Sequence, residues 1–163
     1  AGELFYWLRT PWRMPMRLRM LMNPPTVNAG FNTRAWRAAE IPAANGHASA
    51  RALAALYEAV VRSEQPLLQP ETLSRITRQQ VYAREIVFGH RMRFGLGFML
   101  NAPELGIGPS PRSFGHTGAG GAVAFADPDA RLGFAYVMNR RHPMRTLLVA
   151  PAQALVRAVY AAL

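Results

Sequence analysis

The sequence predicts an α+β fold in which helices pack on an antiparallel sheet. Two segments repeat apolar residues at the roughly 3.6-residue spacing of an amphipathic helix, and between them short apolar runs alternate with turn residues. The 163 residues, of which 50% are hydrophobic, suffice for one domain with a core of ordinary size. We therefore expect one domain and draw no boundary within residues 1–163.

Residues 1–40 form a basic segment of loops and short helical turns. They hold six arginines against two glutamates, and the dense run LFYWLRTPWRMPMRLRMLMNPP occupies residues 4–25. Pro11 and Pro15 interrupt any continuous helix, because proline lacks the N–H of the helical hydrogen bond and clashes with the preceding turn. We favour a loop-rich cover for a core over an arm that docks on a membrane surface or a partner.

Residues 41–92 are expected to be a helical region. Apolar spacing predicts a helix from about Ser49 to Arg62, after a loop punctuated by proline, asparagine and glycine. A second, short helix is expected at QPETLSRI, residues 69–76, because Pro70 is acceptable at the first helical position.

Residues 93–163 are expected to hold strands and a terminal helix. RFGLGFML, residues 93–100, has glycines near its centre and is expected to be a strand that another backbone approaches closely. The runs at 122–126 and 132–139 flank the turn sequence DPDAR and predict a hairpin. The segment after Pro151 repeats apolar residues at helical spacing, so we expect it to lie on the sheet.

All 19 basic residues are arginine, which excludes lysine chemistry from this chain. Schiff-base formation, a phosphate-loop lysine and a lysine general base are impossible, since arginine stays protonated. The net charge of +10 would suit nucleic acid or an anionic membrane, but no base-reading motif is present. We expect no specific nucleic-acid partner and only a weak attraction to membrane surfaces.

Further compositional features exclude other classes of site. Without cysteine there is no disulfide, thiol catalysis or thiolate metal site, and the four histidines are scattered, so we expect no metal and no cofactor. The chain shows neither a secretory signal pattern nor the roughly 18 continuous apolar residues of a membrane span. The cytoplasm is the default expectation, and the compartment stays open.

The stretch FGHTGAGG, residues 114–121, is the candidate site. Four glycines in eight residues serve either a tight turn or a close approach of a ligand to bare backbone. The stretch directly precedes the first strand of the expected hairpin. Ser113, beside it, is the nearest serine, but no Gly-x-Ser-x-Gly elbow accompanies it.

Here the sequence resembles the C-terminal half of the superfamily of serine β-lactamases, penicillin-binding proteins and family VIII esterases. The third motif of that superfamily is Lys-Thr-Gly or His-Thr-Gly on a strand beside the active site, and His116, Thr117 and Gly118 match it. PAANGHASARALAALY, RFGLGF and FGHTGAGGAVAFADPDARLGFAYVMN match in order and spacing. The resemblance implies a three-layer α/β/α domain with an antiparallel sheet, present here in incomplete form.

The resemblance also implies a function, the hydrolysis of a small acyl substrate through an acyl-serine. In the superfamily, the residue after the glycine of the third motif contributes its N–H to the oxyanion hole, and the resemblance implies this role for Ala119. His116 would be a hydrogen-bond donor or partial positive charge, and Thr117 would offer a hydroxyl.

Three further residues are candidates for the substrate pocket. Gly120 belongs to the glycine run, and Asn45 and His47 lie in the loop before the first long helix. A capping turn explains Asn45 equally well, and we favour that interpretation.

The residues that would attack the substrate are not in this sequence. Relatives use a serine in Ser-x-x-Lys and a tyrosine in Tyr-x-Asn, and neither motif occurs, since the spacing from Tyr136 to Asn139 is wrong. The resemblance therefore implies a partner, the N-terminal half of the same hydrolase in the same or a companion chain, and inactivity without it. The alternative is a non-enzymatic module that binds a partner or a membrane through its N-terminal arm.

Asp127 and Asp129 flank Pro128 and resemble a carboxylate pair for acid–base chemistry. Aspartate is also favoured in hairpin turns for its local hydrogen bonds. We interpret both as solvent-exposed turn residues.

Overall fold

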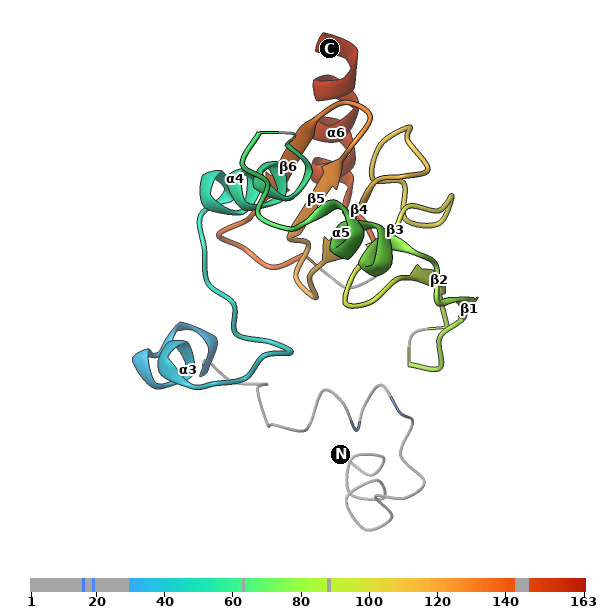
Figure 1. Cartoon of the computed structure of the whole chain (residues 1–163). Helices are drawn as coiled ribbons and strands as arrows, with labels where there is room; N and C mark the ends of the chain where they lie inside the picture. The colour runs from blue at the N-terminus through green and yellow to red at the C-terminus, as the bar shows by residue number, and fades with distance from the viewer. Residues whose placement is uncertain (1–15, 17–18, 20–29, 63, 88, 143–146) are drawn as a thin grey trace. The chain divides into compact units, whose positions relative to one another are not determined.

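The computed structural model describes residues 16, 19, 30–62, 64–87, 89–142 and 147–163. They fall into two compact units, the first drawn from the described residues up to 47 and from 85–87 and 89, the second from those of 48–84 and 90–163 (Figure 1). The second unit carries a sheet with helices on both faces. Most of the basic run at residues 4–25 lies outside the described residues, so its expected broken turns stay a prediction.

The first unit contains the 3₁₀ turn η2 (Gly30–Asn32) and the short helix α3 (Arg34–Ala38). The Thr33 hydroxyl caps α3 by accepting a hydrogen bond from the Trp36 N–H at 3.2 Å, and Trp36 meets the Phe31 ring edge-on at 4.9 Å.

The sheet of the second unit has six antiparallel strands in sequential order, each paired with the next along the chain (Figure 1). This arrangement confirms the antiparallel sheet, including the hairpin expected around the DPDAR turn. The strands are β1 (Val81–Arg84), β2 (Arg91–Phe94), β3 (Met99–Leu100), β4 (Phe114–Thr117), β5 (Val123–Asp127) and β6 (Leu132–Tyr136).

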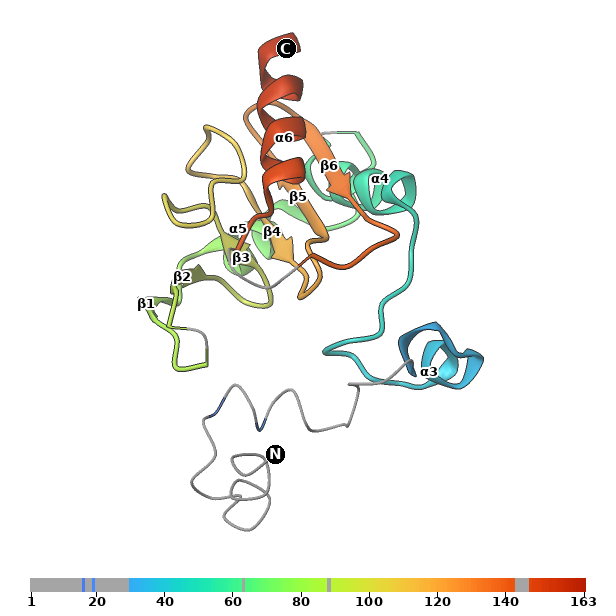
Figure 2. The same ribbon diagram turned by 180° about the vertical axis from the view of Figure 1, so that it is seen from behind.

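Helices cover the two faces of the sheet, so the second unit has three layers. Helices α4 (Ala50–Val61) and α5 (Pro70–Thr77) lie on one face and α6 (Ala150–Ala162) on the other, as the two opposite views show (Figures 1 and 2). A separate core fills each interface. The core under α6 is built around Met99, Ile107, Val123, Phe125, Ala152 and Val156, and the core under α4 and α5 around Val60, Leu100, Phe114 and Ala126.

The three helices of this unit begin where the sequence predicts. Ser49 caps α4 by accepting a hydrogen bond from the Ala52 N–H at 3.2 Å, and Pro70 and Pro151 stand in the first turns of α5 and α6.

Two expectations about the central region are wrong. The helical region expected at residues 41–92 includes strand β1 and the start of β2, and the single strand expected at 93–100 is a hairpin that turns through Gly97 at φ +81°. Strand β1, VYAR, shows no apolar alternation, and β2, RMRF, alternates arginine with apolar residues over four positions only, so neither gives a strong strand signal. The Arg91 guanidinium lies 4.4 Å from the centre of the Tyr82 ring and joins β2 to β1 through a cation–π contact.

Candidate active site

The His-Thr-Gly motif lies at the end of β4, next to β5. Phe114 and Gly115 are buried, His116 is exposed and Thr117 is half-buried. Gly115 is required by packing, since a Cβ there would stand 2.1 Å from the Ala124 carbonyl oxygen on β5. The motif strand is therefore fixed against its neighbour by the absence of a side chain.

The residues after the motif form a tight turn. The Gly118 N–H donates to the Ala122 carbonyl at 2.7 Å, and the N–H groups of Gly120 and Gly121 donate to the Gly118 carbonyl at 2.8 and 3.0 Å. Gly121 has φ +108°, a conformation that favours glycine. The glycine run therefore serves both a turn and a close approach of two strands.

The Ala119 amide differs from its neighbours in this turn. Ala119 is exposed, and within the described residues its N–H donates to no acceptor, whereas the N–H groups of Gly118, Gly120 and Gly121 are all bonded. An unbonded main-chain N–H in an exposed residue beside a fixed strand is a suitable donor for an anionic oxygen.

His116 is held in one tautomer by its own backbone. Its Nδ1 lies 2.7 Å from the Thr117 carbonyl oxygen, and since a carbonyl only accepts, Nδ1 carries the proton. The neutral ring therefore presents the Nε2 lone pair as an acceptor, and only the protonated ring donates from Nε2. The expected donor role thus requires protonation of His116.

Two other candidates on this strand and turn have partners of their own. The Thr117 hydroxyl donates a weak hydrogen bond to the Met99 sulfur at 3.7 Å. Gly120 is buried, its carbonyl accepts from the His142 N–H at 2.8 Å, and a Cβ there would stand 3.1 Å from atoms of Met138 and Arg141. Gly120 thus shapes the turn, and its place in a substrate pocket stays a prediction.

Asn45 and His47 belong to the first unit and make local contacts within it. The Asn45 amide donates to the carbonyls of Trp36, at 2.8 Å, and Ala39, and its oxygen accepts from the Ile41 N–H at 3.2 Å. His47 Nδ1 lies 2.7 Å from the Asn45 carbonyl. These contacts favour the capping-turn interpretation of Asn45, and the pocket role of both residues remains a prediction.

The expectation that Asp127 is a solvent-exposed turn residue is wrong. Only 1% of its surface is exposed, and its carboxylate accepts hydrogen bonds from the Asp129 and Ala130 N–H groups and, at 2.5 Å, from the Tyr160 hydroxyl of α6. Asp129 does face solvent and pairs with Arg112 at 2.6 Å. The sequence does not indicate the contact between Asp127 and Tyr160, because Tyr160 belongs to a stripe of apolar residues at helical spacing.

The contact between Asp127 and Tyr160 changes the acidity of the phenol. Burial first, and then the hydrogen bond to Asp127, raise the pKa of Tyr160 well above its usual value, while the nearby Ser113 hydroxyl acts in the opposite direction. Ser113 is fully buried, and within the described residues its oxygen makes no hydrogen bond of regular geometry. A substrate therefore has no access to Ser113 as a nucleophile.

The described part of the chain holds neither a cluster of metal ligands nor a helix that could span a membrane. No three histidine, aspartate or glutamate side chains there are grouped as metal ligands. None of the helices in that part combines the length and apolar character needed to cross a membrane.

Comparisons with known proteins agree on one family. A model of the Beta-lactamase family matches residues 6–158. The chain is 37% identical over 106 residues to a Mycobacterium tuberculosis (strain ATCC 25618 / H37Rv) protein named Esterase/beta-lactamase LipL, a match that covers 63% of this chain and 24% of that protein.

Solved structures of the same kind share the fold. A family VIII carboxylesterase superposes with a TM-score of 0.79 at 37% identity, covering 88% of this chain and 39% of that one. A penicillin-binding protein homologue from Caulobacter crescentus superposes with a TM-score of 0.73 at 38% identity, covering 80% and 36%. The chain thus spans less than two fifths of each relative's length.

Proposed function

This chain belongs to the beta-lactamase family of serine hydrolases, and from that premise we propose that it supplies the C-terminal half of an esterase-type active site. The complete enzyme would hydrolyse an acyl ester in two steps. A serine on the other half attacks the ester carbonyl and releases the alcohol, and water then attacks the acyl-serine and releases the acid.

The exposed Ala119 amide supports this proposal most directly. Negative charge develops on the carbonyl oxygen during both attacks, and a preorganised N–H in a fixed turn stabilises it without reorganisation. Loss of one such donor typically costs about 3 kcal/mol of transition-state stabilisation. The second donor would be the N–H of the attacking serine.

His116 and Thr117 would face the substrate beside this amide. The Nε2 atom of neutral His116 is a hydrogen-bond acceptor, so it would accept a hydrogen bond from a hydroxyl of the substrate or of the other half. The Thr117 hydroxyl can exchange its weak sulfur partner for a substrate oxygen.

The partner in this proposal is the nucleophile-bearing half of the same hydrolase, in the same or a companion chain. This chain contains no lysine and no Tyr-x-Asn sequence, so it cannot supply the activating groups that the superfamily uses. On its own it should therefore be inactive.

Complementation tests the proposal. The 163-residue chain, mixed with the half that carries Ser-x-x-Lys and Tyr-x-Asn, should restore cleavage of p-nitrophenyl butyrate. Ala119→Pro removes the N–H and should lower kcat by about a hundredfold or more, whereas Ala119→Gly keeps it and should stay within a few-fold of the parent. Equal rates for the two variants, with unchanged circular dichroism, would exclude Ala119 as the oxyanion donor.

The same mixture decides between esters and β-lactams. A chromogenic cephalosporin offered in parallel should be cleaved much more slowly than the ester. Preferential cleavage of the cephalosporin would make the complete protein a β-lactamase.

A further inference from the structure

The geometry points to a second binding site in the chain, a groove beside α5 that takes a small apolar carboxylate. The groove lies on the α4 and α5 face of the sheet, has a volume of about 440 Å³, and is lined from α5, β2, β3 and the segment that leads into β4. This volume is in the range of small-molecule sites. Its lining residues include Leu73, Ser74, Arg93, Leu100, Arg112 and Phe114.

The floor of the groove is apolar. Its accessible apolar surface comes from Leu73 of α5, Pro111 and Pro128, which are half-buried or exposed, whereas the lining residues Leu100 and Phe114 are 3% and 0% exposed and belong to the core. A short hydrocarbon chain laid on this floor would be removed from water, which is favourable in proportion to the area covered.

Arg93 gives the groove its charge. Arg93 is half-buried, and neutral groups hold its guanidinium in place: Nε donates to the Gln79 side chain at 2.8 Å, and Nη1 donates to the carbonyls of Asn101 at 3.1 Å and Pro111 at 3.4 Å. Within the described residues Arg93 has no carboxylate partner and its Nη2 has no acceptor. A half-buried cation without a counter-ion, fixed by its own framework, is a ready partner for an anion.

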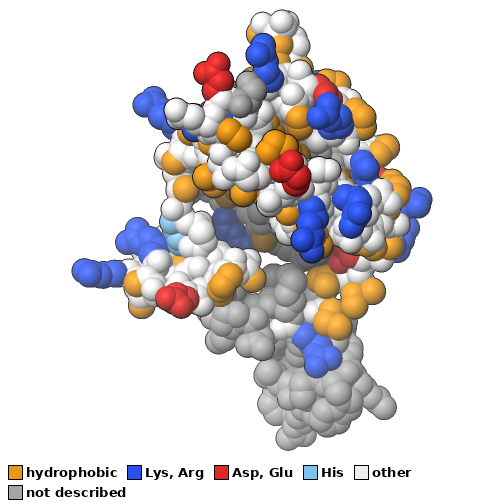
Figure 3. Space-filling model, in the orientation of Figure 1, with side chains coloured by type: hydrophobic (Ala, Val, Ile, Leu, Met, Phe, Trp, Pro, Cys, Tyr) orange, Lys and Arg blue, Asp and Glu red, His pale blue; other side chains and the backbone are white. Residues whose placement is uncertain are grey.

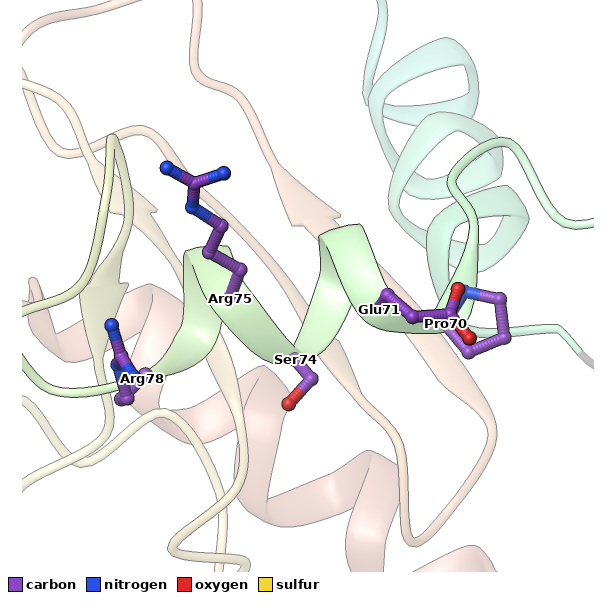
Figure 4. A pocket seen from close by; sticks show the side chains of 5 residues that line it. All are labelled: Pro70, Glu71, Ser74, Arg75 and Arg78. Atoms are coloured by element: carbon purple, nitrogen blue, oxygen red, sulfur yellow. The ribbon is translucent and has the colours of Figure 1, made fainter.

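The residues around the groove add to the positive charge of Arg93 rather than neutralise it. Arg112 is already paired with Asp129, whereas Arg75 and Arg78 line the adjoining hollow on α5 and make no ion pair in the described chain (Figure 4). Figure 3 shows cationic side chains gathered over the face where α5 lies. The one acid in this hollow is Glu71, at the start of α5.

Floor and charge together identify the class of ligand. A carboxylate reaches the unused side of the Arg93 guanidinium while its hydrocarbon tail lies over Leu73 and Pro111. The Ser74 hydroxyl, which has no hydrogen bond within the described residues, stands at the rim and can donate to the same carboxylate. This site does not depend on the hydrolase function, since it uses none of the residues assigned to acyl transfer.

Titration of the isotope-labelled chain with octanoate, followed by NMR, tests the site. Octanoate should shift the Arg93 Nε–H resonance and the Leu100 and Phe114 amides, and octanol should bind more weakly. Arg93→Gln should raise the Kd for octanoate by at least about tenfold. Arg157→Gln, which removes one charge from exposed α6 on the opposite face, should leave the Kd unchanged.

A second pair of variants keeps the test decisive if Arg93→Gln fails to fold. Ser74→Glu places a carboxylate at the rim and should abolish octanoate binding, whereas Ala161→Glu, which adds the same charge at an exposed position of α6, should bind octanoate like the parent. The proposal is overturned if octanoate leaves these resonances in place, if octanol binds equally well, or if Arg157→Gln weakens binding as much as Arg93→Gln. It is also overturned if an acidic peptide binds the groove more tightly than octanoate, which would make it a protein-docking surface.

Discussion

At the scale of single residues, the position of the motif strand depends on Gly115. A methyl group there would stand 2.1 Å from the Ala124 oxygen and 2.5 Å from the Phe125 Cα, both on the neighbouring strand. Because backbone cannot yield as a side chain does, Gly115→Ala should lower the free energy of unfolding by about 2–3 kcal/mol.

Gly118→Ala is the matched control in the same stretch. Its added Cβ would meet Ala122 at an ordinary 3.4 Å, so its stability should stay within about 0.5 kcal/mol of the parent. Urea denaturation measures both variants. Equal midpoints would show that β4 and β5 do not approach as closely as described.

Tyr160 should make the fold sensitive to alkaline pH. Its pKa is raised in the folded state, so the protonated phenol stabilises the fold fully below the unfolded value of about 10, and this contribution is lost as the pH rises through the folded value. Tyr160→Phe should lower stability at neutral pH by about 1.5–3 kcal/mol, because Asp127 loses a hydrogen-bond donor.

Urea titrations at neutral pH and above pH 10 measure this effect. The parent should lose stability over that range more steeply than Tyr160→Phe. An identical slope in the two proteins would show that the phenol is not held by Asp127.

The residues of the site differ in how readily the sequence alone identifies them. His116, Thr117 and Gly118 are contiguous and form a motif, so sequence alone locates them. The burial of Asp127 is not visible in this way, because its DPDAR context is also that of an exposed turn and its partner Tyr160 lies on α6. The sequence likewise does not show that the Ala119 N–H lacks an acceptor, because this depends on which N–H groups of the turn form hydrogen bonds.

At the scale of elements, the loop between β3 and β4 is organised by one buried side chain. The Asn101 amide donates to the carbonyls of Gly108 and Ser110 at 2.9 and 2.8 Å, and its oxygen accepts from the Ile107 N–H at 3.1 Å. Asn101→Ala leaves these buried groups unpaired and should cost about 3 kcal/mol of stability.

Hydrogen exchange gives the local measure for Asn101→Ala. The Ile107 amide should exchange much faster in the variant than in the parent, while Asn139→Ala, at an exposed position, should leave it protected. Unchanged protection of Ile107 in Asn101→Ala would contradict the role of the side chain.

Strands and helices were predictable where apolar spacing is regular. Helices α4, α5 and α6 and the β5–β6 hairpin follow from periodicity and turn residues, which are local signals. Strands β1 and β2 carry arginine and aromatic side chains on a partly exposed edge, so their pairing depends on tertiary contacts such as that between Arg91 and Tyr82.

At the scale of the whole molecule, an antiparallel sheet between helical layers brings one candidate amide and one histidine to the end of β4. All basic residues of this chain, whose net charge is +10, are arginines; some of them line the hollows beside α5, and Arg141 lies beside the turn that follows the motif. The three-layer architecture was predictable through the resemblance, whereas the groove beside α5 was not, since its lining comes from residues distant in sequence.

We propose that this chain takes part in acyl transfer but does not carry the attacking group. The most direct measurement is intact-mass spectrometry of the purified 163-residue chain after incubation with a serine-directed fluorophosphonate, alongside a p-nitrophenyl butyrate assay. We expect an unchanged mass and no turnover above the buffer rate. A single phosphonate adduct on one serine, accompanied by ester hydrolysis that the adduct abolishes, would contradict the proposal that the attacking group lies outside this chain.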